Sequence, residues 1–134
     1  MVGAVIITHG TLAQALLSAA ESIAGKVEGV STLSISQSDT TEGLRDVLTL
    51  SLKGADSGHG VLIFTDMFGG TPTNMALSTF EKGRVEVITG VNLPMVLKYL
   101  SHRSEKGLYD LSVLLRDYGQ KSIVLAGDML KEKK

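Results

Sequence analysis

The chain contains no cysteine, and this absence removes several kinds of chemistry at once. Disulfide bridges, thiolate nucleophiles and thiolate metal ligands are all excluded. Tryptophan is also absent, and only three tyrosines and three phenylalanines occur, which argues against a platform for stacking bases or sugars. Any chemistry must therefore rest on histidine, carboxylate, hydroxyl and backbone groups.

An excess of charge of either sign is missing as well. The 13 Lys and Arg residues nearly balance 14 Asp and Glu residues, so the formal net charge is −1. No basic field is present for nucleic acid and no polybasic stripe for an anionic membrane. The apolar runs are far shorter than the roughly 20 residues that span a bilayer, and the stretch from Val2 has no charged leader. We therefore expect a cytoplasmic protein without a nucleic-acid partner.

Several signature motifs of enzymes are also lacking. No G-x-S-x-G nucleophile elbow occurs, and neither a Walker A lysine nor a G-x-G-x-x-G loop indicates a nucleotide site. A metal site would need three or four ligands, but His59 and His102 do not belong to the same strand ends as His9. We interpret both as surface histidines and expect no metal and no cofactor.

The sequence does contain a regular alternation of apolar strand-like runs and helical patterns over its 134 residues. This alternation predicts one α/β domain, a sandwich of helices around a mainly parallel sheet. We expect the domain to cover residues 1–126 and residues 127–134 to form a solvated tail. The expected strands are residues 2–8, 30–35, 60–65, 85–89 and 122–125. The expected helices begin at 11, near 44, at 71, after the GVNLP segment and at 105.

Local signals predict where some helices begin and end. Thr11 and Gln14 have the spacing of a capping box for the first helix. Thr71 and Pro72 have the character of an N-cap and a first helical residue. Gly119 is placed to end the helix expected over residues 105–118.

The polar residues gather where the apolar strands end. The first strand ends in THG with His9, and the third ends in TDMFGGTPTN with Asp66. In open α/β sheets, ligands bind beyond the carboxyl ends of the strands. A carboxylate that accepts a hydrogen bond from one ring nitrogen orients a histidine and leaves the other nitrogen as nucleophile or base. We expect His9 and Asp66 to form such a pair.

Glycines precede two of the expected helices. Gly69 and Gly70 stand before Thr71, and Gly10 stands before Thr11. Glycine lets backbone N–H groups approach an anion, and the helix dipole favours negative charge at this end. A tight strand-to-helix turn is the simpler interpretation of either segment alone. Together with a histidine, the two segments predict a site for an anion, with phosphate as the obvious candidate.

Three segments, in this order and spacing, resemble one known family over essentially the whole chain. They are THG with His9, FTDMFGGTPTN at residues 64–74, and GVNLPM at residues 90–95. The family is the IIA domain of the mannose family of the sugar phosphotransferase system (PTS). Its fold implies a three-layer sandwich with a four-stranded parallel sheet and an extra antiparallel strand, here residues 122–125, exchanged in a homodimer.

The resemblance implies a phosphocarrier that takes a phosphoryl group from the carrier protein HPr and passes it to a IIB domain. The phosphorylated residue falls on His9, with phosphate on Nε2, and the orienting carboxylate falls on Asp66. Thr71 is the hydroxyl near the phosphoryl group, where relatives often have serine. The remaining expected site residues are Gly10, Gly69 and Gly70 as phosphate support, and Phe68, Asn74 and Asn92 as the rim or partner interface.

The chain stops after the IIA domain, so a separate IIB protein is expected, with indirect association to the membrane components IIC and IID. Three other interpretations stay open at this point. The first is a solitary regulator whose phosphorylation state is read by partners. The second is a phosphocarrier for dihydroxyacetone kinase, and the third is a flavodoxin-like domain with an incidental histidine. The GGTPTN segment favours the mannose-type IIA over the kinase subunit.

Overall fold

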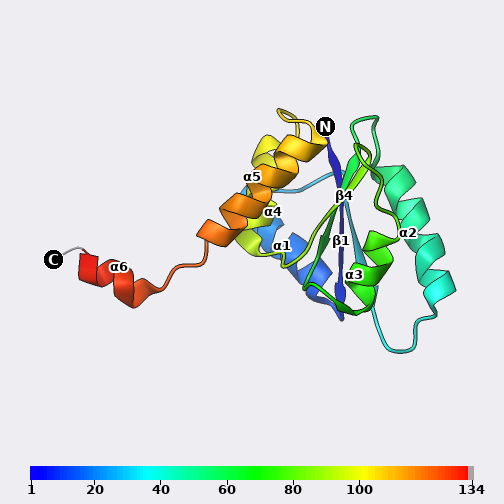
Figure 1. Ribbon diagram of the computed structural model, residues 1–134, viewed down its shortest axis with the longest axis horizontal. Helices are drawn as coiled ribbons and strands as arrows, with labels where there is room; N and C mark the ends of the chain where they lie inside the picture. Colours follow the sequence, from blue (N-terminus) through cyan, green and yellow to red (C-terminus); the bar gives the residue numbers. More distant parts are fainter. Residues whose placement is uncertain (133–134) are drawn as a thin grey trace.

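A computed structural model describes residues 1–132 of the chain (Figure 1). Strands and helices alternate from the N-terminus, as the sequence predicts. The strands are β1 Gly3–His9, β2 Val30–Ile35, β3 Val61–Thr65 and β4 Val85–Ile88. The helices are α1 Leu12–Ala24, α2 Thr41–Ala55, α3 Gly70–Leu77, α4 Leu93–His102, α5 Leu108–Lys121 and α6 Ala126–Glu132.

The four strands form one parallel sheet in the order β2-β1-β3-β4. Strands β1 and β3 lie in the centre and are built almost entirely from buried residues. Apolar β-branched runs of this kind are typical of strands that are covered on both faces. After β1 the chain adds β2 on one side and then β3 on the other, so the strand order reverses between β1 and β3.

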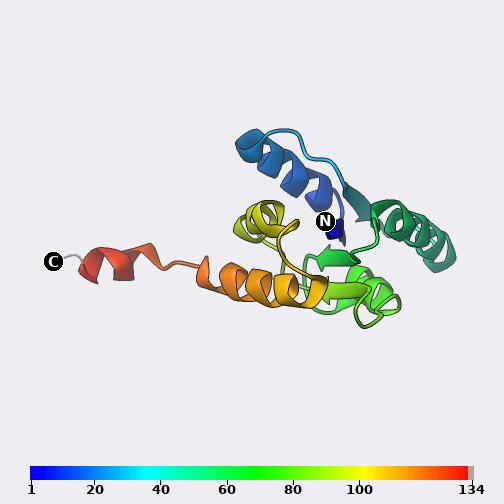
Figure 2. The same cartoon turned by 90° about the horizontal axis from the view of Figure 1, so that it is seen from above.

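Helices cover both faces of the sheet, and the α/β sandwich predicted from the sequence is confirmed (Figures 1 and 2). Alternate side chains of β1 and β3, such as Ile6 and Phe64, pack with α1, α4 and α5 in one core. The intervening side chains, such as Ile7 and Ile63, pack with α2 and α3 in the other. Tyr99 anchors the first core through an edge contact with the Phe64 ring and a hydrogen bond to the Val2 carbonyl.

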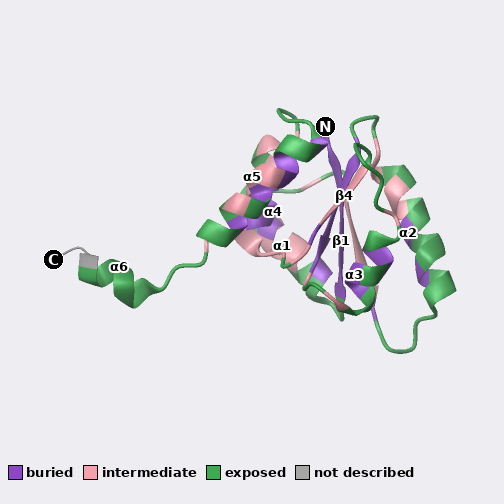
Figure 3. Cartoon of the chain, viewed as in Figure 1, coloured by how far each residue is buried: buried purple, intermediate pink, exposed green. Residues whose placement is uncertain are grey.

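The strand expected at residues 122–125 is wrong for the single chain. Ser122 caps the end of α5, and the next three residues belong to neither a strand nor a helix. Ile123, Val124 and Leu125 are 80%, 55% and 71% exposed, because the chain leaves the body of the domain at this point (Figures 1 and 3). Beyond them α6 projects away from the sheet, and within residues 1–132 this segment pairs with none of the four strands.

One expected cap and two expected helix boundaries are also corrected. Thr11 is the N-cap residue of α1, as expected, but its side chain makes no capping hydrogen bond. Helix α3 already begins at Gly70, so Thr71 is its second residue and not its N-cap. Gly119 does not end α5, which continues to Lys121. The end of the Met95 side chain packs directly against Gly119, where a Cβ would lie 2.5 Å from Met95 Cε. Within residues 1–132 no helix combines the length and apolar character that a membrane span requires.

Candidate functional site at the carboxyl edge of the sheet

His9 and Asp66 meet where the strand order reverses. His9 is the last residue of β1, and Asp66 follows the last residue of β3. These neighbouring strands run in parallel, so their carboxyl ends lie at the same edge of the sheet. In open α/β sheets, the point where the strand order reverses is the usual ligand position. The pairing expected from the sequence is therefore present.

A buried threonine and a glycine hold His9 at the end of its strand. The Thr8 hydroxyl accepts a hydrogen bond from the Ala13 N–H at 2.8 Å, and so it replaces the cap expected from Thr11. Gly10 adopts a left-handed conformation with φ of 54°, which turns the chain from β1 towards α1. Its N–H donates to the Ile35 carbonyl at 3.0 Å. The donor of Gly10 is thus engaged in the fold.

Asp66 holds both the backbone and the ring of His9 through one oxygen. Its Oδ2 accepts from the His9 backbone N–H at 3.0 Å and lies 2.8 Å from the ring Nδ1. Its Oδ1 accepts from the Met67 N–H at 3.0 Å. The Asp66 side chain is only 13% exposed, whereas that of His9 is 51% exposed. The carboxylate is shielded and the ring faces outward.

The protonation of the pair follows from these contacts. Burial raises the pKa of the Asp66 carboxyl, but the hydrogen bonds from the His9 backbone and ring outweigh it, so that its pKa lies below the ordinary value. An ionised carboxylate only accepts hydrogen bonds, so Nδ1 of His9 is the ring nitrogen that carries the proton. The neutral imidazole then keeps its lone pair on Nε2, which is the atom available to an electrophile.

The first residue of α3 lies against the His9 ring. A Cβ on Gly70 would be 3.2 Å from Cε1 and 3.4 Å from Nε2 of His9, and Gly70 has φ of 82°. Both observations explain why glycine is needed at this position. Gly69, the N-cap, supplies no side-chain hydrogen bond to α3. The N-terminal end of this helix therefore lies beside Nε2, with the exposed Thr71 on its first turn.

Two buried threonines that sequence reasoning did not single out fix the loop of Asp66. The Thr65 and Thr73 hydroxyls lie 2.8 Å apart, and Thr73 also donates to the Met67 carbonyl. The Thr65 carbonyl in turn accepts from the Val91 N–H. Fully buried hydroxyls need such partners, because an unpaired buried polar group is costly. The signal in the sequence was the threonine at the end of each central strand, Thr8 and Thr65.

The three residues expected at the rim lie in different settings. Phe68 is 79% exposed on the loop between Asp66 and α3. Asn74 is exposed on α3. Asn92 accepts from the Met95 N–H as N-cap of α4 and donates to the Gly119 carbonyl, so both ends of its side-chain amide are engaged within the fold.

The other histidines lie away from this edge. The N-terminal amine lies 3.3 Å from His59, just before β3, and His102 ends α4 beside Glu105. In the part of the chain that the structure describes, no three His, Asp or Glu residues are grouped as metal ligands would be.

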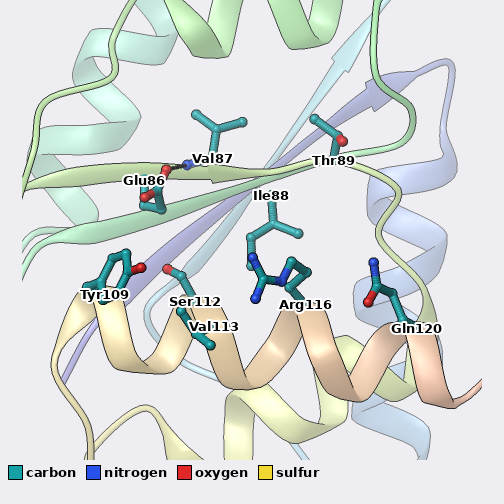
Figure 4. Close-up of a pocket in the computed structure, with 9 residues that line it drawn as sticks. All are labelled: Glu86, Val87, Ile88, Thr89, Tyr109, Ser112, Val113, Arg116 and Gln120. Atoms are coloured by element: carbon teal, nitrogen blue, oxygen red, sulfur yellow. Dashed lines mark hydrogen bonds between the residues drawn. The ribbon is translucent and has the colours of Figure 1, made fainter.

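Away from the His9 edge, a hollow of about 420 Å³ lies between β4 and α5 (Figure 4). Ser112 and Arg116 point from α5 towards β4. The charged side chains that line this hollow already have partners: Glu86 accepts a hydrogen bond from the Val87 N–H, and Arg116 pairs with Asp117. No oriented nucleophile faces it, so the His9 edge is the better candidate for chemistry.

The arrangement suits the capture of an electrophilic phosphorus. It combines a nucleophilic Nε2, a carboxylate that would stabilise positive charge on the ring, and a helix N-terminus that favours an anion. Substitution at phosphorus requires mainly positioning and stabilisation of the equatorial oxygens. At this edge, Asp66 positions the His9 ring, and the N-terminus of α3 can stabilise the equatorial oxygens.

Comparisons with known proteins show the family of the chain. Residues 3–112 match the EIIA-man family, described as "PTS system fructose IIA component". The mannose-specific EIIAB component of the PTS from Escherichia coli K12 is 36% identical over 112 residues, which are 83% of this chain and 35% of that protein. The chain thus spans about a third of the length of that relative. The fructose-specific EIIA component from Bacillus subtilis is 31% identical over 100% of this chain and 92% of its own length.

A solved structure supports the fold. The phosphotransferase system component EIIA from Streptococcus agalactiae superposes with a TM-score of 0.86. The match covers 96% of this chain and 99% of that one at 24% identity. It confirms the α/β fold.

Proposed function

Since the chain belongs to the EIIA-man family of PTS IIA components, we propose that it accepts a phosphoryl group from phospho-HPr on Nε2 of His9. It then passes the group to a separate IIB protein in carbohydrate uptake. The observation that carries this proposal is the His9 ring, held by Asp66 at Nδ1 and open at Nε2.

The transfer needs no external proton donor. The Nε2 lone pair forms the new N–P bond while the N–P bond to the donor histidine breaks, and that electron pair returns to the donor ring. The phosphorylated His9 ring keeps its proton on Nδ1 and gains positive charge, which the ionised Asp66 stabilises. Because one phosphohistidine replaces another, the exchange is close to symmetric and reversible.

Neutral groups would support the phosphoryl oxygens. We assign this role to the Thr71 hydroxyl and the backbone of Gly69 and Gly70, at the N-terminal end of α3. Gly10 supports the site through its turn, because its N–H is bonded to Ile35. Phe68 and Asn74 are exposed near this end of α3 and are assigned to the partner interface. Neutral donors hold phosphate loosely enough for onward transfer.

The homodimer stays a prediction with two supporting observations. Ile123, Val124 and Leu125 are exposed apolar residues, and β4 is an edge strand with the hollow of Figure 4 beside it. Exposed strand edges and apolar segments are usually covered by a partner. The cytoplasmic location, the IIC and IID association, and the division into a domain of residues 1–126 and a tail of 127–134 also stay predictions.

Phospho-HPr provides the direct test. The wild-type protein should gain a phosphohistidine, detected by ³¹P NMR as an Nε2 adduct. His9→Ala should reduce incorporation to background, and His102→Ala, which also removes a histidine–carboxylate pair, should leave it unchanged. Incorporation into His9→Ala at the wild-type rate would overturn the proposal.

Adding candidate IIB proteins and sugars extends the test to the next step. Loss of phosphate from the chain to IIB supports the transport role. Phosphate that arrives and stays favours the regulator, and transfer to a dihydroxyacetone kinase favours that phosphocarrier role.

A further inference from the structure

A second, smaller cavity lies beside the His9 edge, between α2 and α3. It measures about 240 Å³ and is lined by Thr41, Arg45, Thr71, Asn74 and Met75. Thr71 is the residue that follows Gly70, whose backbone lies against the His9 ring. The cavity therefore opens next to the position where Nε2 meets its partner.

Arg45 is the cationic group of this cavity, and it differs from the other arginines of the chain. Arg84 pairs with Asp56 and Glu81, Arg103 donates to the Glu28 carbonyl, and Arg116 pairs with Asp117. Within residues 1–132, Arg45 is exposed and forms no ion pair, not even with Glu42 one turn earlier on α2. Its guanidinium is available to an anion.

The rest of the lining has matching chemistry. Thr41 and Asn74 supply a hydroxyl and an amide, and in the described part of the chain neither side chain forms a hydrogen bond. Thr71 also lines the cavity, but its hydroxyl is the group assigned above to the phosphoryl oxygens. Arginine with neutral donors around it is a typical recognition site for a carboxylate or phosphate.

The position and size of the cavity decide between possible anions. His9, Asp66 and Gly70 do not line it, so a phosphoryl group on Nε2 does not fill it. At about 240 Å³ it is also below the ~300–1,000 Å³ of ordinary small-molecule sites. A single side chain fits it better than a free metabolite. The protein that delivers phosphate to His9 must dock over this surface, so its side chains are the ones that reach the cavity.

We infer that Arg45 and its cavity bind an aspartate or glutamate side chain of the protein that donates the phosphoryl group to His9. This assignment rests on the proposed function and adds a docking residue to it. Arg45 acts on the partner and not on the phosphoryl group, so it governs the concentration of donor needed and leaves the maximal rate of transfer unchanged. Charge complementarity of this kind sets encounter rate and register.

The test measures the rate of His9 phosphorylation against the concentration of phospho-HPr. Arg45→Ala should raise the half-saturating concentration roughly tenfold at an unchanged maximal rate, and Arg45→Glu should raise it further. Arg45→Lys should restore part of the loss. Lys53→Ala is the matched control, because it removes one positive charge from the same helix outside the cavity. It should change the value less than twofold.

Phosphoramidate, a small-molecule donor with an N–P bond, separates docking from catalysis. All variants should accept phosphate from it at the wild-type rate. A slower reaction of Arg45→Ala with phosphoramidate would overturn the assignment, because Arg45 would then act on the phosphoryl group. Equal shifts in Arg45→Ala and Lys53→Ala would overturn it too. Failure of the wild type to accept phosphate from either donor would sink the proposed function instead, and unfolding curves of each variant verify that it is folded.

Discussion

Residues 1–132 contain two histidine–carboxylate pairs of nearly the same length and very different character. Nδ1 of His9 lies 2.8 Å from Asp66, and Nδ1 of His102 lies 2.9 Å from Glu105. Asp66 is 13% exposed and Glu105 is 65% exposed. The Asp66 carboxylate is therefore shielded from water, whereas water competes with His102 for the Glu105 carboxylate.

The two pairs also differ in how they are built. Glu105 is three residues beyond His102 and reaches it locally, whereas Asp66 is 57 residues beyond His9 and comes from another strand. Asp66 accepts from the His9 backbone as well as its ring, and threonine hydroxyls brace its loop. A histidine–carboxylate distance alone thus identifies no site. Burial of the carboxylate, bracing of its loop and an adjacent helix N-terminus make the difference.

The largest expected difference between the pairs is in transfer rate. Asp66→Asn keeps the side-chain shape but removes the charge that fixes the proton on Nδ1 of His9. Phosphoryl transfer from phospho-HPr should slow about 10- to 100-fold, as for other residues that orient a reactive histidine. Glu105→Gln should stay within twofold of wild type in the same assay. Equal rates in the two variants would show that the comparison has no functional meaning.

A second test concerns the bracing of the loop. Thr73→Val removes the hydroxyl that contacts Thr65 and Met67 and leaves their polar groups unpaired in the interior. The free energy of unfolding in urea should fall by about 1–3 kcal/mol. Ser101→Ala removes an exposed hydroxyl beside His102, which bonds only to the Leu97 carbonyl. It should change stability by less than about 0.5 kcal/mol, and a similar loss in both variants would contradict the bracing role.

The smallest expected effect is on the pH dependence of stability. The pKa of Asp66 is lowered by folding, so its ionised form stabilises the protein at all pH values above the unfolded pKa of about 3.9. This contribution is lost as the pH falls from about 4 through the lower pKa of the folded state. The difference in unfolding free energy between wild type and Asp66→Asn should be constant above about pH 5 and shrink below pH 4.

Ser101→Ala provides the reference for that titration, because it removes no titratable group. Its difference from wild type should be the same at every pH. A wild-type to Asp66→Asn difference that grows on acidification would contradict the lowered pKa of Asp66.

Much of the fold was predictable because it follows from local pattern. The buried β-branched runs and the helical spacings placed four strands and the main helices close to their observed ranges. Helix ends were less predictable, since a cap depends on which neighbour is near. Thr8 bonds to Ala13 where Thr11 was expected to act, and Gly119 packs against Met95 inside a helix that it was expected to end. The segment 122–125 has strand character, but a strand needs a neighbouring edge.

By itself, the sequence determined that a histidine and an aspartate stand at the carboxyl ends of two strands, since apolar runs with polar ends are a local property. Tertiary structure decided that these strands are neighbours, that Asp66 takes Nδ1 and leaves Nε2 open, and that Gly70 begins a helix against the ring. It also brought Arg45 of α2 beside Thr71 of α3. Each of these facts joins residues far apart in the chain, and only the packing of helices on the two faces of the sheet brings them together.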